Sequence, residues 1–150
     1  MSPADIAIYG GAAGGGKTYA LLLECLRHVD NPDFGAVVFR RQSNQITNEG
    51  GLWDTANNMY IPLGAMPKLS PSPQMVFKSG AKVSFHHMQY EKDKFGWQGS
   101  QIPLIAFDEL THFSEGQFVY MLSRNRSTCG VKPYIRATTN PDADSLVAEF

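Results

Sequence analysis

Residues 11–18 read Gly-Ala-Ala-Gly-Gly-Gly-Lys-Thr and match the phosphate-binding pattern G-x-x-x-x-G-K-[ST] in full. An apolar run at 6–9 precedes this octapeptide and an apolar stretch at 19–26 follows it, which predicts a strand, a loop and a helix in that order. Glycines let successive backbone N–H groups point into one concavity, where a polyphosphate fits at the positive end of the helix dipole. Lys17 would reach the β- and γ-phosphates, and Thr18 would bind Mg²⁺. The predicted nucleotide-binding residues are Gly11, Ala12, Ala13, Gly14, Gly15, Gly16, Lys17 and Thr18.

The other elements are expected to alternate in type. Strands are predicted at 5–9, 36–39, 104–107 and 134–138, and helices at 17–28, 43–58 and 115–123. Residues 75–85 are typical of a hairpin that turns at Ser79-Gly80, whereas the proline-containing segment 66–73 is expected to be a loop. Strands separated by helices favour an α/β fold, with a mainly parallel sheet covered by helices on both faces.

Length and charge limit the classes of function. A chain of 150 residues with 43% hydrophobic residues is enough for one domain with its own core. The formal net charge of −1 gives no general attraction to nucleic acid, so a DNA contact must come from local basic clusters. Three pairs are candidates, although each is also explained as a solvated face: Lys78 with Lys82, Lys92 with Lys94, and Arg124 with Arg126.

The two cysteines, Cys25 and Cys129, have no metal-ligand spacing and form no disulfide framework. No apolar run approaches the length of a membrane span, and the N-terminus does not resemble a signal peptide. We therefore expect a soluble protein of a reducing cytoplasm with no membrane partner.

A pair of acids follows the predicted strand 104–107. At the carboxyl edge of the sheet, Asp108 would hold Mg²⁺ and Glu109 would polarise a water molecule for attack on the γ-phosphoryl group. Taken alone, Asp-Glu after a strand is more often a helix cap, but a phosphate-binding loop upstream reverses that preference. A second acid on the same strand end is typical of ATP-hydrolysing motors and helicases rather than of GTPases or kinases.

The strand at 134–138 also ends in small polar residues. Thr139 or Asn140 could lie beside the γ-phosphate and pass its loss to a moving segment, or the strand could simply close in an Asn-Pro turn. His86 and His87 occupy adjacent strand positions, so they point to opposite faces and are interpreted as structural residues rather than as ligands of one metal ion.

With these motifs placed, the chain resembles the ATPase domain of the large terminase subunit of tailed bacteriophages, the motor that drives DNA into an empty capsid. The resemblance covers nearly the whole chain. It rests on residues 10–18, Val38-Phe39-Arg40-Arg41, Phe77-Lys78-Ser79-Gly80, Trp97-Gln98-Gly99-Ser100-Gln101, Ile105-Ala106-Phe107-Asp108-Glu109-Leu110-Thr111, Ser123-Arg124-Asn125-Arg126 and Thr138-Thr139-Asn140-Pro141.

The resemblance implies a P-loop NTPase fold of the RecA-like type, which has an additional catalytic glutamate, and a Mg²⁺-dependent ATPase. It places Lys17 and Thr18 on ATP, Asp108 on Mg²⁺ and Glu109 as the base, with Thr138, Thr139 and Asn140 coupling hydrolysis to movement of double-stranded DNA. It also implies a homo-oligomeric ring that works with a portal ring and a small terminase subunit in the host cytoplasm.

Three departures from the family pattern qualify this transfer. Ala12 and Ala13 stand where many members carry an arginine, so a charge-stabilising arginine must come from elsewhere, with Arg124 and Arg126 the first candidates and Arg40 and Arg41 behind them. The upstream segment that usually holds the adenine is short, and no nuclease domain follows, so we expect a single ATPase domain over 1–150 that is truncated at both ends. A helicase ATPase and an inactive or structural nucleotide-binding remnant stay open as alternatives.

Overall fold

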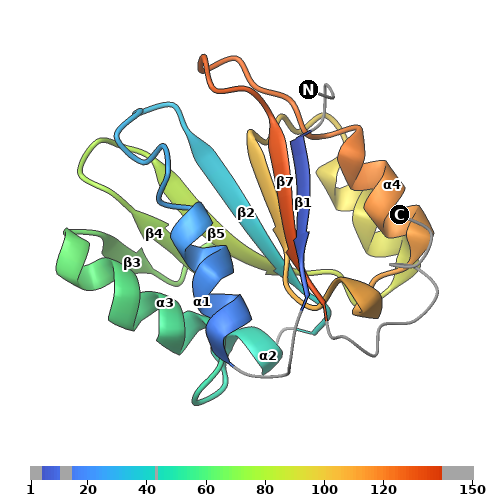
Figure 1. Ribbon diagram of the computed structural model, residues 1–150, viewed down its shortest axis with the longest axis horizontal. Coiled ribbons are helices and arrows are strands. Elements are labelled where there is room, and N and C mark those ends of the chain that lie inside the picture. The colour runs from blue at the N-terminus through green and yellow to red at the C-terminus, as the bar shows by residue number, and fades with distance from the viewer. Residues whose placement is uncertain (1–4, 11–14, 43, 140–150) are drawn as a thin grey trace.

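The computed structural model describes residues 5–10, 15–42 and 44–139, which form a seven-stranded sheet (Figure 1). The strand order is β1-β7-β6-β2-β5-β4-β3. Five neighbouring strands are parallel: β1 (Asp5–Tyr9), β7 (Tyr134–Thr138), β6 (Leu104–Phe107), β2 (Gly35–Arg40) and β5 (Lys82–His87). Two short antiparallel strands, β4 (Gln74–Val76) and β3 (Met66–Lys68), extend the sheet at one side. The predicted α/β fold with a mainly parallel sheet is confirmed.

Helices cover both faces of the sheet (Figure 1). One face carries α1 (Gly15–Glu24), α2 (Asn44–Thr47) and α3 (Leu52–Tyr60), which the 3₁₀ turn η1 (Ile61–Leu63) extends. The other face carries α4 (Glu115–Leu122) and the 3₁₀ segments η2 (Glu91–Trp97) and η3 (Leu110–His112). Across the ranges that the structure describes, none of the helices combines the length and apolar character needed to cross a membrane.

The two faces have separate hydrophobic cores because side chains alternate along each strand. In β2, Ala36 and Val38 are buried beneath α1 and α3, whereas Val37 and Phe39 are buried on the face of α4. Strand β6 alternates in the same way and is buried throughout. A strand buried on both faces is typical of a parallel sheet, and it explains the continuous apolar runs of the sequence.

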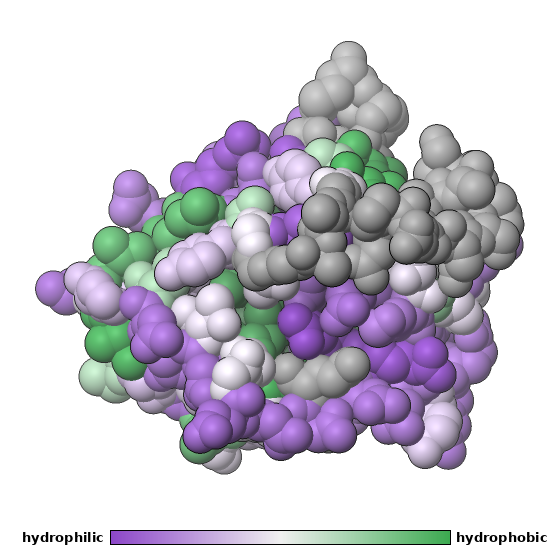
Figure 2. All heavy atoms as spheres, turned by 60° about the horizontal axis from the view of Figure 1, so that its bottom comes forward, coloured by the Kyte–Doolittle hydropathy of each residue, from purple (hydrophilic) through white to green (hydrophobic). Residues whose placement is uncertain are grey.

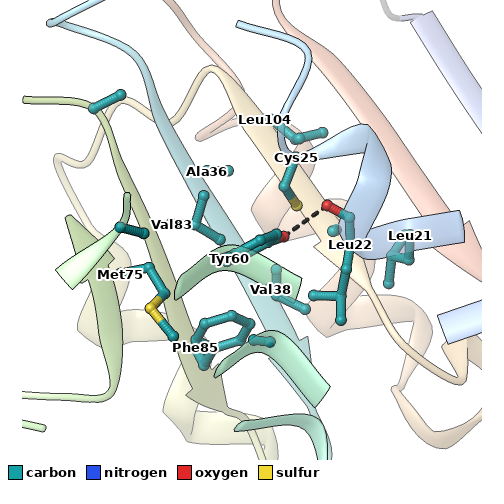
Figure 3. Close-up of a cluster of buried hydrophobic side chains, with 14 of the residues drawn as sticks. Leu21, Leu22, Cys25, Ala36, Val38, Tyr60, Met75, Val83, Phe85 and Leu104 are labelled. Atoms are coloured by element: carbon teal, nitrogen blue, oxygen red, sulfur yellow. Dashed lines mark hydrogen bonds between the residues drawn. The ribbon is translucent and has the colours of Figure 1, made fainter. Parts of the chain in front are cut away.

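Tyr60 joins the helices of the first core (Figure 3). Its ring is buried against the sheet, and its hydroxyl donates a hydrogen bond to the carbonyl of Leu22 at 2.6 Å. Burial raises the pKa of this hydroxyl above its usual value, so it stays a donor. The bond satisfies a polar atom that would otherwise be costly to bury, and it fixes α3 against α1.

Three predicted elements differ from the observed ones. The helix expected over 43–58 is two helices, α2 and α3, because Gly50 adopts φ 76° between them. The segment 66–73 is only partly a loop, since 66–68 forms the edge strand β3, where a proline is tolerated. Helix α1 ends at Glu24 rather than at residue 28, and turns follow it. The other predicted strands, the hairpin and the helix near 115–123 are confirmed.

A candidate nucleotide site at the carboxyl edge of the sheet

The carboxyl ends of β1, β7, β6 and β2 meet at one edge of the sheet, at the bottom of Figure 1, and α1 begins there. Open parallel sheets bind their ligands at this edge, because the loops that follow the strands gather there. Figure 2 brings this edge forward and shows a mostly hydrophilic surface across its right and lower parts, with hydrophobic side chains gathered at its left.

Lys17 and Thr18 lie in the first turns of α1. The Lys17 Nζ donates to the backbone carbonyl of Thr139 at 2.7 Å, so the lysine extends across the end of β1 to the end of β7. The backbone N–H of Thr139 in turn donates to the carbonyl of Tyr9 at 3.0 Å. Residues 11–14 of the predicted phosphate loop and Asn140 lie outside the described residues.

Asp108 is buried, with a relative exposure of 1%, and donors from three elements surround its carboxylate. The hydroxyl of Thr138 donates to Oδ1 at 2.7 Å, and the hydroxyl of Thr18 lies 3.4 Å from the same oxygen. The Nε of Arg40 donates to Oδ2 at 2.5 Å. A carboxylate so buried requires such partners, and here α1, β7 and β2 supply them.

Glu109 follows with an unusual backbone. Of the non-glycine residues that the structure describes, it alone has a positive φ, with φ 60° and ψ 66°. Its backbone N–H donates to the Thr138 hydroxyl at 2.8 Å, while its carboxylate lies 3.8 Å from Arg40 and 3.7 Å from the Nε2 of His112. Left-handed backbone in a residue with a side chain is costly and concentrates at functional sites. The conformation leaves the Glu109 side chain 33% exposed, whereas the neighbouring Asp108 is buried.

Arg40 lies at the end of β2 and lines a hollow beside the first turn of α1. This hollow has a volume of about 300 Å³ and is also lined by Thr18, Tyr19, Gly50, Gly51, Leu52 and Thr55. The site thus contains two acids, a lysine, an arginine and open space beside them. Arg41 points elsewhere and donates to the carbonyls of Gln89 and His112.

A partly buried ion pair fixes α1 on the sheet. Arg136 in β7 donates from Nε to Glu24 of α1 at 3.3 Å, and the hydroxyl of Tyr9 donates to the other oxygen of Glu24 at 3.1 Å. Burial, followed by the charge of Glu24, raises the pKa of Tyr9, which keeps its hydroxyl a donor. These contacts tie the helix that carries Lys17 to the two strands beneath it.

Arg124 and Arg126 lie at the opposite edge of the sheet. The carbonyl of Arg124 accepts a hydrogen bond from the N–H of Ile102, just before β6 begins, and the Asn125 amide donates to the carbonyls of Ile102 and Pro103. Because β6 runs from there toward Asp108, the two arginines are a strand length away from the acids of their own chain. Within one chain they do not join the site that Lys17, Thr18, Asp108 and Glu109 form.

The oxygen donors of the site suit Mg²⁺. Thr18 and Asp108 offer a hydroxyl and a carboxylate on adjoining elements, and hard oxygen ligands are those that Mg²⁺ prefers. In the described part of the chain, no three His, Cys, Asp or Glu side chains gather into a metal cluster. This donor set fits an ion held by few protein ligands together with substrate phosphates rather than an all-protein cage.

Comparison with known protein families identifies the chain. The family model described as "Terminase large subunit, T4likevirus-type, N-terminal" matches residues 8–150. The chain belongs to this family. A search of curated proteins finds no match.

Solved structures of phage terminases share the fold. The large terminase of a thermophilic bacteriophage has a TM-score of 0.66 and 16% identity, over 93% of this chain and 34% of that chain. The bacteriophage HK97 large terminase has a TM-score of 0.68 and 15% identity, over 96% of this chain and 31% of that chain. The N-terminal domain of the DNA packaging ATPase from bacteriophage phi29 has a TM-score of 0.65 and 11% identity, over 99% of this chain and 79% of that chain. This chain thus spans about a third of the first two proteins, and the likeness establishes the P-loop NTPase fold.

Two residues of the site make contacts that the sequence patterns did not specify. Arg40, placed behind Arg124 and Arg126 as a candidate charge-stabilising residue, is the arginine that contacts both Asp108 and Glu109 within one chain. The hydroxyl of Thr138 also bridges the two acids, a contact that its motif alone does not reveal. Both residues end a buried parallel strand, and that position is the signal that could have identified them.

Proposed function

We propose that this terminase-family chain is an ATP-hydrolysing motor domain that powers translocation of double-stranded DNA into a procapsid. The observation that carries the proposal is the convergence of Lys17, Thr18, Asp108 and Glu109 at one sheet edge, from segments about 90 residues apart. The large terminase of the thermophilic bacteriophage has been crystallised in complex with ADP and with ATP-γ-S. That relation supports an adenine nucleotide as the ligand.

The side chains divide the chemistry among them. Lys17 binds the β- and γ-phosphates, Thr18 and Asp108 hold Mg²⁺, and Glu109 accepts the proton of the attacking water. Bound Mg²⁺ neutralises charge on the phosphates. The partial exposure of Glu109 supports the role of base because a water molecule can reach its carboxylate.

Thr138 and Thr139, with Asn140, are proposed to couple hydrolysis to movement. The hydroxyl of Thr138 binds both the Asp108 carboxylate and the Glu109 backbone, and the carbonyl of Thr139 accepts from Lys17. A shift of the acids or of the lysine when the γ-phosphate leaves would therefore move the end of β7 directly. Such a switch requires contacts that differ between two states, and these three hydrogen bonds are the candidates.

The working assembly is proposed to be a homo-oligomeric ring in the host cytoplasm, with a portal ring and a small terminase subunit as partners. Arg124 and Arg126 would then act in trans. They lie away from the site of their own chain, Arg126 is exposed, and Arg124 contacts its near neighbours in sequence, the Ser123 hydroxyl at 3.2 Å and the Tyr120 ring. A neighbouring subunit could present them to this nucleotide, where an arginine accelerates hydrolysis by about 10³–10⁵-fold.

The test is steady-state ATP hydrolysis by the chain with and without duplex DNA, together with calorimetry of ATP binding. Lys17→Ala should weaken ATP binding by about 1.5–3 kcal/mol, the value of a charge-assisted contact. Lys82→Ala, which removes an exposed lysine at the other end of β5, is the control and should bind like the wild type. Asp108→Asn should lose the Mg²⁺ dependence of binding. Equal affinity of the wild type and Lys17→Ala would overturn the site, and hydrolysis that DNA does not stimulate would count against a motor.

A further inference from the structure

The carboxylate of Asp108, which is proposed to hold Mg²⁺, already forms an ion pair with a cationic side chain. The Nε of Arg40 donates to Oδ2 of Asp108, and the two side chains are 17% and 1% exposed. On the other oxygen, Oδ1, the Thr138 hydroxyl donates at 2.7 Å. Both oxygens of Asp108 therefore have a close donor, and a metal ion that binds either one must share it or displace that donor.

Of these donors, Arg40 is the one that a metal ion would repel. The hydroxyls of Thr138 and Thr18 are neutral, whereas a guanidinium is always charged, and Mg²⁺ beside it on one buried carboxylate would place three positive charges against one negative charge. Water screens such repulsion poorly at a buried site. A displaced Arg40 side chain also has an alternative position, because its Nη1 is 3.8 Å from Glu109 and its side chain lines the hollow with Gly51 and Thr55.

We propose that Arg40 and the divalent cation compete for Asp108, so that the guanidinium leaves this carboxylate when the metal binds. The inference rests on the proposed function in taking Asp108 as a metal-binding residue. Arg40 is then a positioning residue that lowers metal affinity until nucleotide phosphates add their own negative charge. Metal binding and release of Arg40 toward the hollow become one event.

The next residue provides a matched control. Arg41 has the same charge and is exposed, but it donates to the backbone carbonyls of Gln89 and His112 and not to Asp108. Neutralising Arg41 changes the net charge of the chain as neutralising Arg40 does. A difference between the two variants therefore reports the Arg40–Asp108 contact rather than the general field.

The experiment titrates Mn²⁺ into the nucleotide-free chain and follows free Mn²⁺ by electron paramagnetic resonance. Arg40→Gln should bind Mn²⁺ about 10- to 100-fold more tightly than the wild type, the range expected on removal of a charge-assisted competitor. Arg41→Gln should bind like the wild type, and adding Asp108→Asn to Arg40→Gln should abolish the gain. Equal Mn²⁺ affinity in folded Arg40→Gln and the wild type would overturn the competition.

A second measurement uses the wild type, so it does not depend on the folding of a variant. The Arg40 Nε–H signal in NMR should shift when Mg²⁺ is added to the chain with ATP-γ-S, and an unmoved signal would also overturn the inference. Calorimetry of ATP-γ-S on the same samples separates the two proposals. Absence of nucleotide binding counts against the proposed function, whereas the Mn²⁺ titration without nucleotide tests Arg40 alone.

Discussion

Thr138→Val removes a single hydroxyl that bridges the two acids, while nearly keeping the shape of the side chain. Thr138 is buried, and its Oγ1 donates to Asp108 Oδ1 at 2.7 Å and accepts from the Glu109 N–H at 2.8 Å. Valine loses both bonds. A hydrogen bond to a charged group is worth about 1.5–3 kcal/mol, and an unsatisfied backbone N–H adds about 1 kcal/mol when it is only partly buried. We expect the free energy of unfolding to fall by about 2.5–4 kcal/mol.

Urea unfolding measures this loss, because a change in midpoint at constant slope reports stability alone. Thr138→Ser is the control, since it keeps the hydroxyl and loses one methyl group worth about 1 kcal/mol. The order of stability should be wild type, then serine, then valine. A valine variant as stable as the serine variant would refute the reasoning, because it would mean that the hydroxyl does not hold the acids.

Three further predictions concern catalysis, assembly and pH. Glu109→Gln should retain ATP but lose about 10²–10⁴-fold in turnover, as expected for a general base, and comparison of calorimetry with steady-state rates checks this. Lys17→Ala subunits keep both arginines, and subunits mutated to Ala at Arg124 and Arg126 keep the phosphate loop. If the arginines act in trans, mixing the two variants should restore ATP hydrolysis. Unchanged activity of the double arginine variant by itself would exclude these residues. Burial, with the nearby charge of a second histidine, lowers the pKa of His86 from 6.5 to about 4. Between pH 6.5 and 4 the unfolded chain therefore binds a proton that the folded chain does not. The free energy of unfolding should fall by at most about 1.4 kcal/mol per pH unit as the pH decreases through this range. His86→Gln should reduce this slope, which urea titrations at several pH values measure.

The sequence by itself determined most of the order of the elements and the position of the phosphate-loop and acidic motifs at strand ends. The phosphate-loop pattern ending in Lys17-Thr18 and the pair Asp108-Glu109 each stand at a strand end, and both signals are local. Because parallel strands place their carboxyl ends at one edge of the sheet, the sequence also predicted that these two motifs lie close together. Their contact in the structure, Thr18 with Asp108, spans 90 residues of sequence.

The tertiary structure alone decided which charged groups complete that site. Strand β7 lies between β1 and β6, which brings Thr138 to both acids, and β2 lies beside β6, which brings Arg40 to Asp108 across 68 residues. Local patterns do not encode strand order, and so they did not predict the contact of Arg40 with Asp108. The left-handed backbone of Glu109 is likewise imposed by its surroundings, since an isolated glutamate avoids this conformation. Charge partners in a buried site are chosen by strand adjacency, which only the folded sheet fixes.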